Sequence, residues 1–431
     1  MTTPSTDTVT PDAEVIDAET TAPEAPEAPE APEAPEAPEA PEAPEAPDVG
    51  FTLSPLDNAT ELSRRIARET AALGPPGWRR VQATFSMTVA GESTAMVFTD
   101  EHDRVARVFP TESVLALLRE HRHLSASLGD GPWWRYLLTL TDEGKLDVDY
   151  DYGDDPFPDD QLFAPEAYRA DLAVYPRAQV PLWLAAYVGH GGRQSRPPQL
   201  AAAQARNDEA TGRVPVRCAT DTEFPDFGVL ARRWAVIAAG FVAVGSMWGP
   251  RVAPSTCVFE GVRRSGSTLQ ALPGDRAVLS GGVWNAPALA AVYRDGAESP
   301  DLYRGAPAWV ADPVLNARTG SGLLSFCYWW ADGHWYRADS PGADELAEAV
   351  PGVWTADIVA GIIAGLLTDH PTESQYAAAR RLVADAETGV VTRAVLTEVF
   401  DGDFDVDGAY FQLTVAGATA PDATVDAGVT P

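Results

Sequence analysis

The sequence predicts an α+β protein with two successive α+β units, antiparallel sheets flanked by helices, and a disordered N-terminal tail. Two patterns indicate this class: apolar residues alternate along a hairpin at residues 133–152, and segments with helical apolar spacing lie on both sides of it. With 431 residues, 45% of them hydrophobic, the chain can form two or three domains. We expect the first unit at 51–188, a Gly/Arg/Pro linker at 189–199, the second unit at 200–415 and a disordered tail at 416–431.

Residues 1–50 have the composition of a disordered acidic spacer. Eight Pro-Glu-Ala units fill 23–46, and the first 50 residues hold 14 acidic side chains and no Lys or Arg. Proline at every third position blocks helix and sheet, and the glutamates repel one another. An extended, polyproline-II-biased tail is therefore expected.

In the first unit, a helix is expected from Asn58, with Glu61 completing a capping box, to about Ala72. The glycines and prolines of 74–77 end it. The later segments are, in order, a hairpin of strands at 78–89 and 94–99, a short strand at 105–109, a helix from about Thr111, the hairpin at 133–152 and a short apolar element at 180–188.

The second unit contains an apolar segment at 234–249. Its 16 residues are fewer than the roughly 20 that span a bilayer, so we expect a buried helix over about 227–247. Side chains of the aromatic strand at 323–330 form either core or an exposed binding platform, with Tyr328 and Trp330 on one face and Trp329 on the other. The remaining expected elements are strands at 255–260, 277–279 and 409–415, and helices at 355–367, 373–386 and 392–400.

The second strand of the hairpin at 133–152 carries the candidate functional residues. Asp147, Asp149 and Asp151 alternate with Leu146, Val148, Tyr150 and Tyr152, so one face packs on a core and the other carries carboxylates. Carboxylates about 7 Å apart repel, so this face is either simply solvated or meets a cationic partner. The candidate partner-binding residues are Asp147, Asp149, Asp151, Asp154, Asp155, Asp159 and Asp160, with Phe157 and Trp134 as apolar anchors.

The charge balance indicates which partners to expect. Formal net charge is −32, and the chain beyond residue 50 still carries 49 acids against 31 bases. Such a surface disfavours nucleic acid and anionic membranes and favours basic proteins. The three cysteines are far apart and no basic start precedes an apolar stretch, so we expect a cytoplasmic protein without a secretory signal.

No catalytic or cofactor motif is evident: Gly-x-Ser-x-Gly, a P-loop and His-Glu-x-x-His are all absent from the sequence. Asp403, Asp405, Asp407 and Gly408 match the start of an EF-hand loop, but Thr414 stands where the loop needs a bidentate Glu. We therefore expect an acidic turn there, and a protein that is not an enzyme and carries no metal or cofactor.

Several features of the first unit occur together in one known family. A helix leads into Trp78-Arg79-Arg80-Val81, a strand ends in Met96-Val97-Phe98, a helix contains Leu117-Leu118-Arg119, and Trp133 precedes the hairpin with Gly144-Lys145 and its Asp/Tyr strand. With these features, residues 60–187 resemble the YezG-like immunity proteins (antitoxins) of bacterial polymorphic toxin systems. The resemblance implies a cytosolic, non-catalytic protein that blocks a toxin by contact. Chains of that family are usually short and single-domain, so the second unit and the repeat tail are departures.

The expected function is therefore that of an immunity protein which neutralises a cognate, basic toxin through an acidic surface. Many toxin domains cleave nucleic acid with a basic cleft, and an acidic face can fill such a cleft as a phosphate mimic. Two alternatives remain: an adaptor or chaperone for a secreted partner, and an enzyme with its site in 200–415.

Overall fold

The structure, a computed structural model, describes residues 54–219 and 223–420. These residues belong to one compact unit. They contain two antiparallel sheets, of five and seven strands, and eleven α-helices, which confirms the predicted α+β class. The tail expected at 1–50 and most of the one expected at 416–431 lie outside the described residues.

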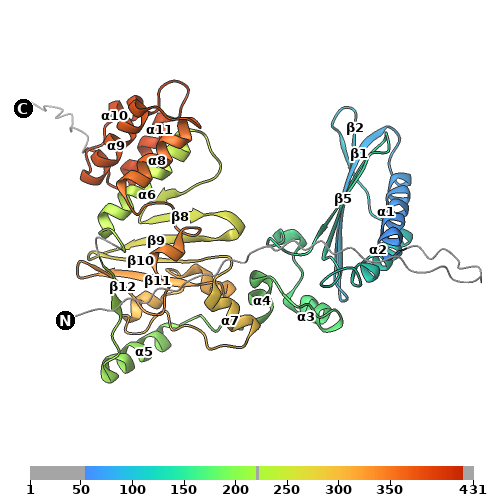
Figure 1. The fold of residues 1–431 in the computed structure, drawn as a ribbon, viewed down its shortest axis with the longest axis horizontal. Helices are drawn as coiled ribbons and strands as arrows, with labels where there is room; N and C mark the ends of the chain where they lie inside the picture. The colour runs from blue at the N-terminus through green and yellow to red at the C-terminus, as the bar shows by residue number, and fades with distance from the viewer. Residues whose placement is uncertain (1–53, 220–222, 421–431) are drawn as a thin grey trace, which may run out of the picture. The chain divides into compact units, whose positions relative to one another are not determined.

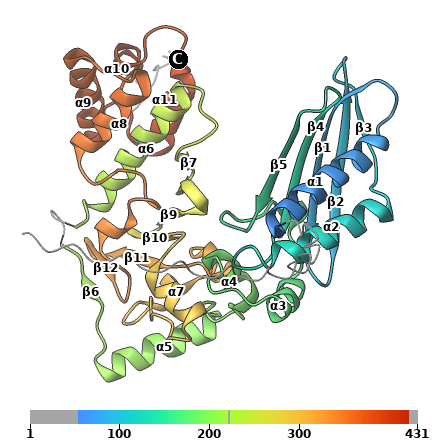
Figure 2. The ribbon, with the colours of Figure 1, turned by 45° about the vertical axis from the view of Figure 1, so that its right-hand side comes forward.

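The five-stranded sheet has the order β3-β2-β1-β4-β5. Helices α1 (Pro55–Ala72) and α2 (Glu112–Ser125) lie along one of its faces (Figure 1, Figure 2). Both predicted hairpins form, and β5 is an edge strand. The strands are β1 Trp78–Met87, β2 Glu92–Asp100, β3 Val105–Arg107, β4 Arg135–Thr141 and β5 Leu146–Asp151.

Helix α1 begins earlier than predicted. Its N-cap is Ser54, whose hydroxyl accepts a hydrogen bond from the Asp57 amide, and Pro55 occupies the first helical position. Proline suits that position because its missing N–H would have no partner there. The capping box expected at Asn58 is therefore wrong: that residue lies inside the first turn and donates its amide to the Ser54 carbonyl.

The apolar sides of α1 and α2 pack against the sheet. Ile66, Leu118, Phe85 and Tyr136 are fully buried there, with Leu146, Val148 and Tyr150 of β5 packed at the margin of the same cluster. The predicted inward face of β5 is thus correct for these three residues. Tyr152 is 39% exposed because it follows the end of the strand.

The seven-stranded sheet has the order β6-β12-β11-β10-β9-β8-β7. Its interior strand β11 is buried on both sides: Tyr328 and Trp330 enter one core cluster, and Trp329 enters another. The core interpretation of this aromatic strand is therefore correct. The strands are β6 Val216–Arg217, β7 Arg251–Ala253, β8 Thr256–Glu260, β9 Gly266–Leu272, β10 Arg276–Gly282, β11 Phe326–Ala331 and β12 His334–Arg337.

Helices gather on both sides of this sheet (Figure 1). All residues of α6 from Trp234 to Gly240 are buried, as predicted. Within the described ranges, no helix is long and apolar enough to cross a membrane. The group around α6 is α6 Phe227–Ala243, α8 Ala356–Leu367, α9 Glu373–Thr388, α10 Arg393–Val399 and α11 Val406–Val415; α5 Pro198–Thr211 and α7 Pro287–Arg294 lie on the other side.

The strand predicted at 409–415 is wrong, because this segment is helix α11. The Asp405 carboxylate caps it by accepting the Gly408 amide. Its buried residues are Ala409, Gln412 and Leu413, spaced three and one apart, which is the period of a helix and not of a strand.

Three α-helices lie between the two sheets in the sequence: α3 (Pro165–Val174), α4 (Leu182–Gly189) and α5. Helix α4 contacts both α3 and α7. In the expected linker, the Gln194 amide donates to the Leu324 carbonyl and accepts from the Leu324 N–H, so this segment is held by side-chain hydrogen bonds.

A buried histidine lies between α2 and the five-stranded sheet. His121 is 2% exposed, and its Nδ1 accepts a hydrogen bond from the Trp133 indole N–H at 3.1 Å. Its Nε2 contacts the hydroxyls of Ser63 and Tyr150 at 3.1 and 3.3 Å. Burial lowers the pKa of His121 from 6.5 to about 4, and protonation of Nδ1 would also oppose the Trp133 N–H.

We expect His121 to make the stability of the fold sensitive to acid. Because the pKa is lower in the folded than in the unfolded chain, the unfolded state takes up the proton first, and stability falls as pH drops from about 6.5 to about 4. The loss amounts to up to about 3 kcal/mol. Urea unfolding followed by tryptophan fluorescence between pH 7.5 and 4 measures it.

His121→Gln, which cannot titrate, should start less stable and lose less stability over this pH range than the wild type. His102→Gln changes an exposed histidine and should leave the wild-type decline in place. Equal declines in wild type and His121→Gln would contradict the assignment.

Candidate functional site

The candidate site begins at the edge strand β5. Asp147 and Asp149 are exposed, and among the described residues neither carboxylate forms an ion pair. In the strand register, Asp147 lies opposite Thr139 and Asp149 opposite Leu137 of β4. Neutral neighbours leave the two negative charges uncompensated, as the alternation predicted.

Both carboxylates belong to the sheet face opposite α1 and α2. The register continues the row from Thr139 to Gln82 of β1, Val97 of β2 and Arg107 of β3. Gln82 and Arg107 are exposed, and Val97 is half-buried. This row of side chains is thus acidic at β5, neutral in the middle and basic at Arg107.

Asp151 differs from the other two β5 acids. It lies opposite Arg135, and its carboxylate accepts from that guanidinium at 2.7 Å. It also accepts the Gly153 amide at 2.7 Å, and both members of the ion pair are largely buried. Asp151 is therefore a structural residue, which corrects its assignment to the partner-binding surface.

Phe157 and Trp134, expected as exposed anchors, are each 1% exposed, so that assignment is also corrected. Their rings pack edge to face with centroids 6.1 Å apart. Gly153 has φ +82°, and a Cβ there would come within 3.1 Å of the Trp134 ring. The two aromatic residues therefore fix the loop after β5 to the protein instead of contacting a partner.

The loop after β5 carries the remaining predicted acids on its surface. Asp154, Asp155, Asp159 and Asp160 are all exposed. Asp155 lies 3.9 Å from Arg263, a distance that gives only a weak surface interaction. We define the acidic edge as the exposed residues Asp147, Asp149, Asp154, Asp155, Asp159 and Asp160.

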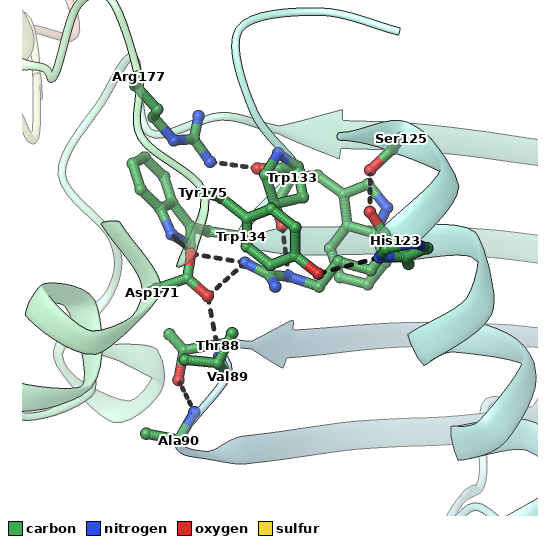
Figure 3. Close-up of polar contacts among 12 residues, drawn as sticks. Thr88, Val89, Ala90, His123, Ser125, Trp133, Trp134, Asp171, Tyr175 and Arg177 are labelled. Atoms are coloured by element: carbon green, nitrogen blue, oxygen red, sulfur yellow. Dashed lines mark hydrogen bonds and ion pairs between the residues drawn. The ribbon is translucent and has the colours of Figure 1, made fainter. Parts of the chain in front are cut away.

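A buried ion pair holds together the segments that support the acidic edge (Figure 3). Asp171 of α3 is fully buried and accepts two hydrogen bonds from Arg122 of α2, at 2.7 and 2.8 Å. It also accepts the Trp134 indole N–H at 2.9 Å and the Val89 amide at 2.8 Å. Arg122 in turn donates through Nε to the Trp133 carbonyl. One carboxylate thus connects α3, α2, the β1–β2 turn and the start of β4.

The described residues offer little for metal or nucleophilic chemistry. They contain no group of three or more His, Cys, Asp and Glu placed to hold a metal ion. In the acidic turn, Asp405 caps α11 and Asp407 pairs with Arg393. Burial raises the pKa of Cys218 and Cys257 to about 12, so both remain thiols.

Two features of this site were not predicted from the sequence, the Arg135–Asp151 pair and the Arg122–Asp171 pair. Arg135 directly follows Trp133 and Trp134, and pairing the two strands by their turn would have placed it opposite Asp151. The Arg122–Asp171 pair gave no such signal, because 49 residues separate its members and nothing local predicts their contact.

No protein-family model matches this chain, and no curated protein matches it in sequence. The resemblance of residues 60–187 to YezG-like immunity proteins stays a prediction.

The buried pair predicts a large mutational effect. Asp171→Leu leaves the Arg122 guanidinium buried without a counter-charge and should lower the free energy of unfolding by about 3–5 kcal/mol. The double variant Arg122→Met/Asp171→Leu removes both charges and should be more stable than Asp171→Leu alone. Urea unfolding at pH 7 measures both.

Glu166→Ala is the matched control, because this exposed residue of the same helix forms a surface pair with Arg169. It should change stability by less than about 0.5 kcal/mol. If Asp171→Leu lowered the free energy of unfolding equally little, the Arg122–Asp171 pair would not be what holds these segments together.

Proposed function

We propose that this protein is a non-catalytic, cytoplasmic immunity protein that binds and neutralises a cognate, basic protein toxin through its acidic edge. One observation carries the proposal: Asp147 and Asp149 are exposed on an edge strand, without a cationic partner among the described residues. The exposed acids of the following loop extend the same negative surface.

Electrostatics explains why such an edge suits a basic partner. Carboxylates on alternate residues of one strand are about 7 Å apart and repel each other weakly in water. A cationic surface relieves this repulsion and is attracted over about a Debye length, which speeds association. The charges also discourage the open edge of β5 from pairing with a second copy of the sheet.

The anchoring of the edge supports the same function. The loop is fixed by Phe157 and Trp134, and Trp134 is fixed by Asp171, so its acids are held on a rigid base. A partner that binds there loses little freedom in the loop, which favours affinity. The resemblance to immunity proteins supports this proposal independently of the geometry.

Charge reversal tests the proposal. Asp147→Lys/Asp149→Lys should retain its fold, because both side chains are exposed, and should slow partner association at least about tenfold. The measurement uses residues 51–431 as bait in the native lysate and then determines binding kinetics with the captured protein. That protein should be basic, stoichiometric, released at about 1 M salt, and toxic to cells when expressed without this chain.

Asp401→Lys/Asp403→Lys is the control, because it changes net charge by the same amount at exposed positions before α11. It should bind and protect cells like the wild type. Unchanged protection by the folded Asp147→Lys/Asp149→Lys variant would remove the acidic edge as the binding surface, and a captured protein without toxicity would remove the immunity function.

A further inference from the structure

A cavity of about 400 Å³ contains four arginines on its lining, although the chain as a whole is strongly acidic. The arginines come from the turn between β8 and β9, from α7 and from the segment before β11. Asp154 is the one acidic residue that lines the cavity in the part of the chain described. The arginines are Arg263, Arg264, Arg294 and Arg318.

Two of these arginines lack a carboxylate partner within the described residues. Arg318 is paired with Glu260 through two contacts of 3.0 Å, and Arg263 lies 3.9 Å from Asp155. Arg264 and Arg294, both exposed, form no such pair.

Each of these two makes a single hydrogen bond to a backbone carbonyl, Arg264 to Phe157 at 3.3 Å and Arg294 to Val180 at 3.0 Å. A guanidinium has five N–H donors, so most of those on both residues are free for a ligand.

The backbone that presents two of the arginines is unusual. Arg263 and Arg264 have φ of 52° and 60°, a region that side chains other than glycine rarely adopt. The turn is fixed on both sides: the Gly261 amide donates to the Ser265 carbonyl, and the Ser265 hydroxyl accepts the Trp284 amide. Consecutive residues in this conformation are typical of positions where function offsets the strain.

The rest of the cavity lining is largely apolar. Leu182, Val283 and Trp284 contribute to it, and the Arg263 guanidinium lies 4.3 Å from the centre of the Trp284 ring. Trp183 also lines the cavity, with its indole N–H fixed by the Gly153 carbonyl at 2.7 Å. An apolar pocket with a few convergent charged groups is the usual form of a small-molecule site, and 400 Å³ is within the usual range of volumes.

We propose that this cavity binds a small organic anion, with its phosphate or carboxylate group on Arg264 and Arg294 and its apolar or aromatic part beside Trp183 and Leu182. Arginine binds both anionic groups bidentately, and the indole ring offers a surface for a flat ligand. The cavity adjoins the acidic edge, because Asp154 lines it and Asp155 lies 3.9 Å from Arg263. The proposed anion contacts are nevertheless made by Arg264 and Arg294, on which the proposed toxin binding does not depend.

Calorimetric titration of the full chain with phenyl phosphate, inorganic phosphate and phenol tests the proposal. Phenyl phosphate should bind more tightly than inorganic phosphate, because it uses both the arginines and the apolar wall, and phenol should bind least. Arg264→Gln/Arg294→Gln should weaken phenyl phosphate binding at least tenfold. Arg65→Gln/Arg206→Gln, an equal charge change at exposed positions outside the cavity, should leave it unchanged.

The thermal unfolding midpoint of each variant verifies its fold, and Arg264→Gln alone replaces the double variant if that one unfolds. Absence of phenyl phosphate binding by the wild type at millimolar concentration would overturn the proposal. So would binding that the arginine substitutions do not weaken, because the anion would then bind elsewhere.

Discussion

The buried pair between Arg122 and Asp171 is the interaction on which the packing of α2 and α3 against the five-stranded sheet depends. A fully buried carboxylate is costly unless its charge and its hydrogen-bonding capacity are both satisfied. Asp171 meets both conditions with one guanidinium, one indole N–H and one backbone amide. Four segments that are distant in sequence must therefore come together before this charge can be buried, which couples α3 to the five-stranded sheet.

The acidic edge follows from that coupling. Asp171 holds Trp134, Trp134 packs on Phe157, and Phe157 fixes the loop whose carboxylates remain in solvent. The aromatic side chains are therefore buried in the protein, whereas the carboxylates are exposed to solvent. Asp151 is instead largely buried, because its charge is neutralised by Arg135 of the neighbouring strand β4. What remains is a negative surface of exposed carboxylates on β5 and the following loop.

Much of the fold could be predicted from local pattern. Strict alternation placed Val148 and Tyr150 inward, and the helix expected from about Thr111 is α2, for which Thr111 is the N-cap. The errors have physical causes. The segment expected as a strand at 409–415 is helix α11, in which the buried residues have helical spacing. Trp134 was placed outside because its indole partner lies 37 residues away. Contacts at such separation depend on tertiary packing, which local patterns do not encode.

Hydrogen–deuterium exchange on the complex with the captured basic partner tests the central claim most directly. Strand β5 is hydrogen-bonded to β4 on one side only, so its outward amides exchange quickly in the free protein. If the partner binds the acidic edge, exchange should be slower in β5 and in the loop at 153–161 when the partner is bound. Slower exchange confined to α1 and α2, or to the seven-stranded sheet, would contradict it.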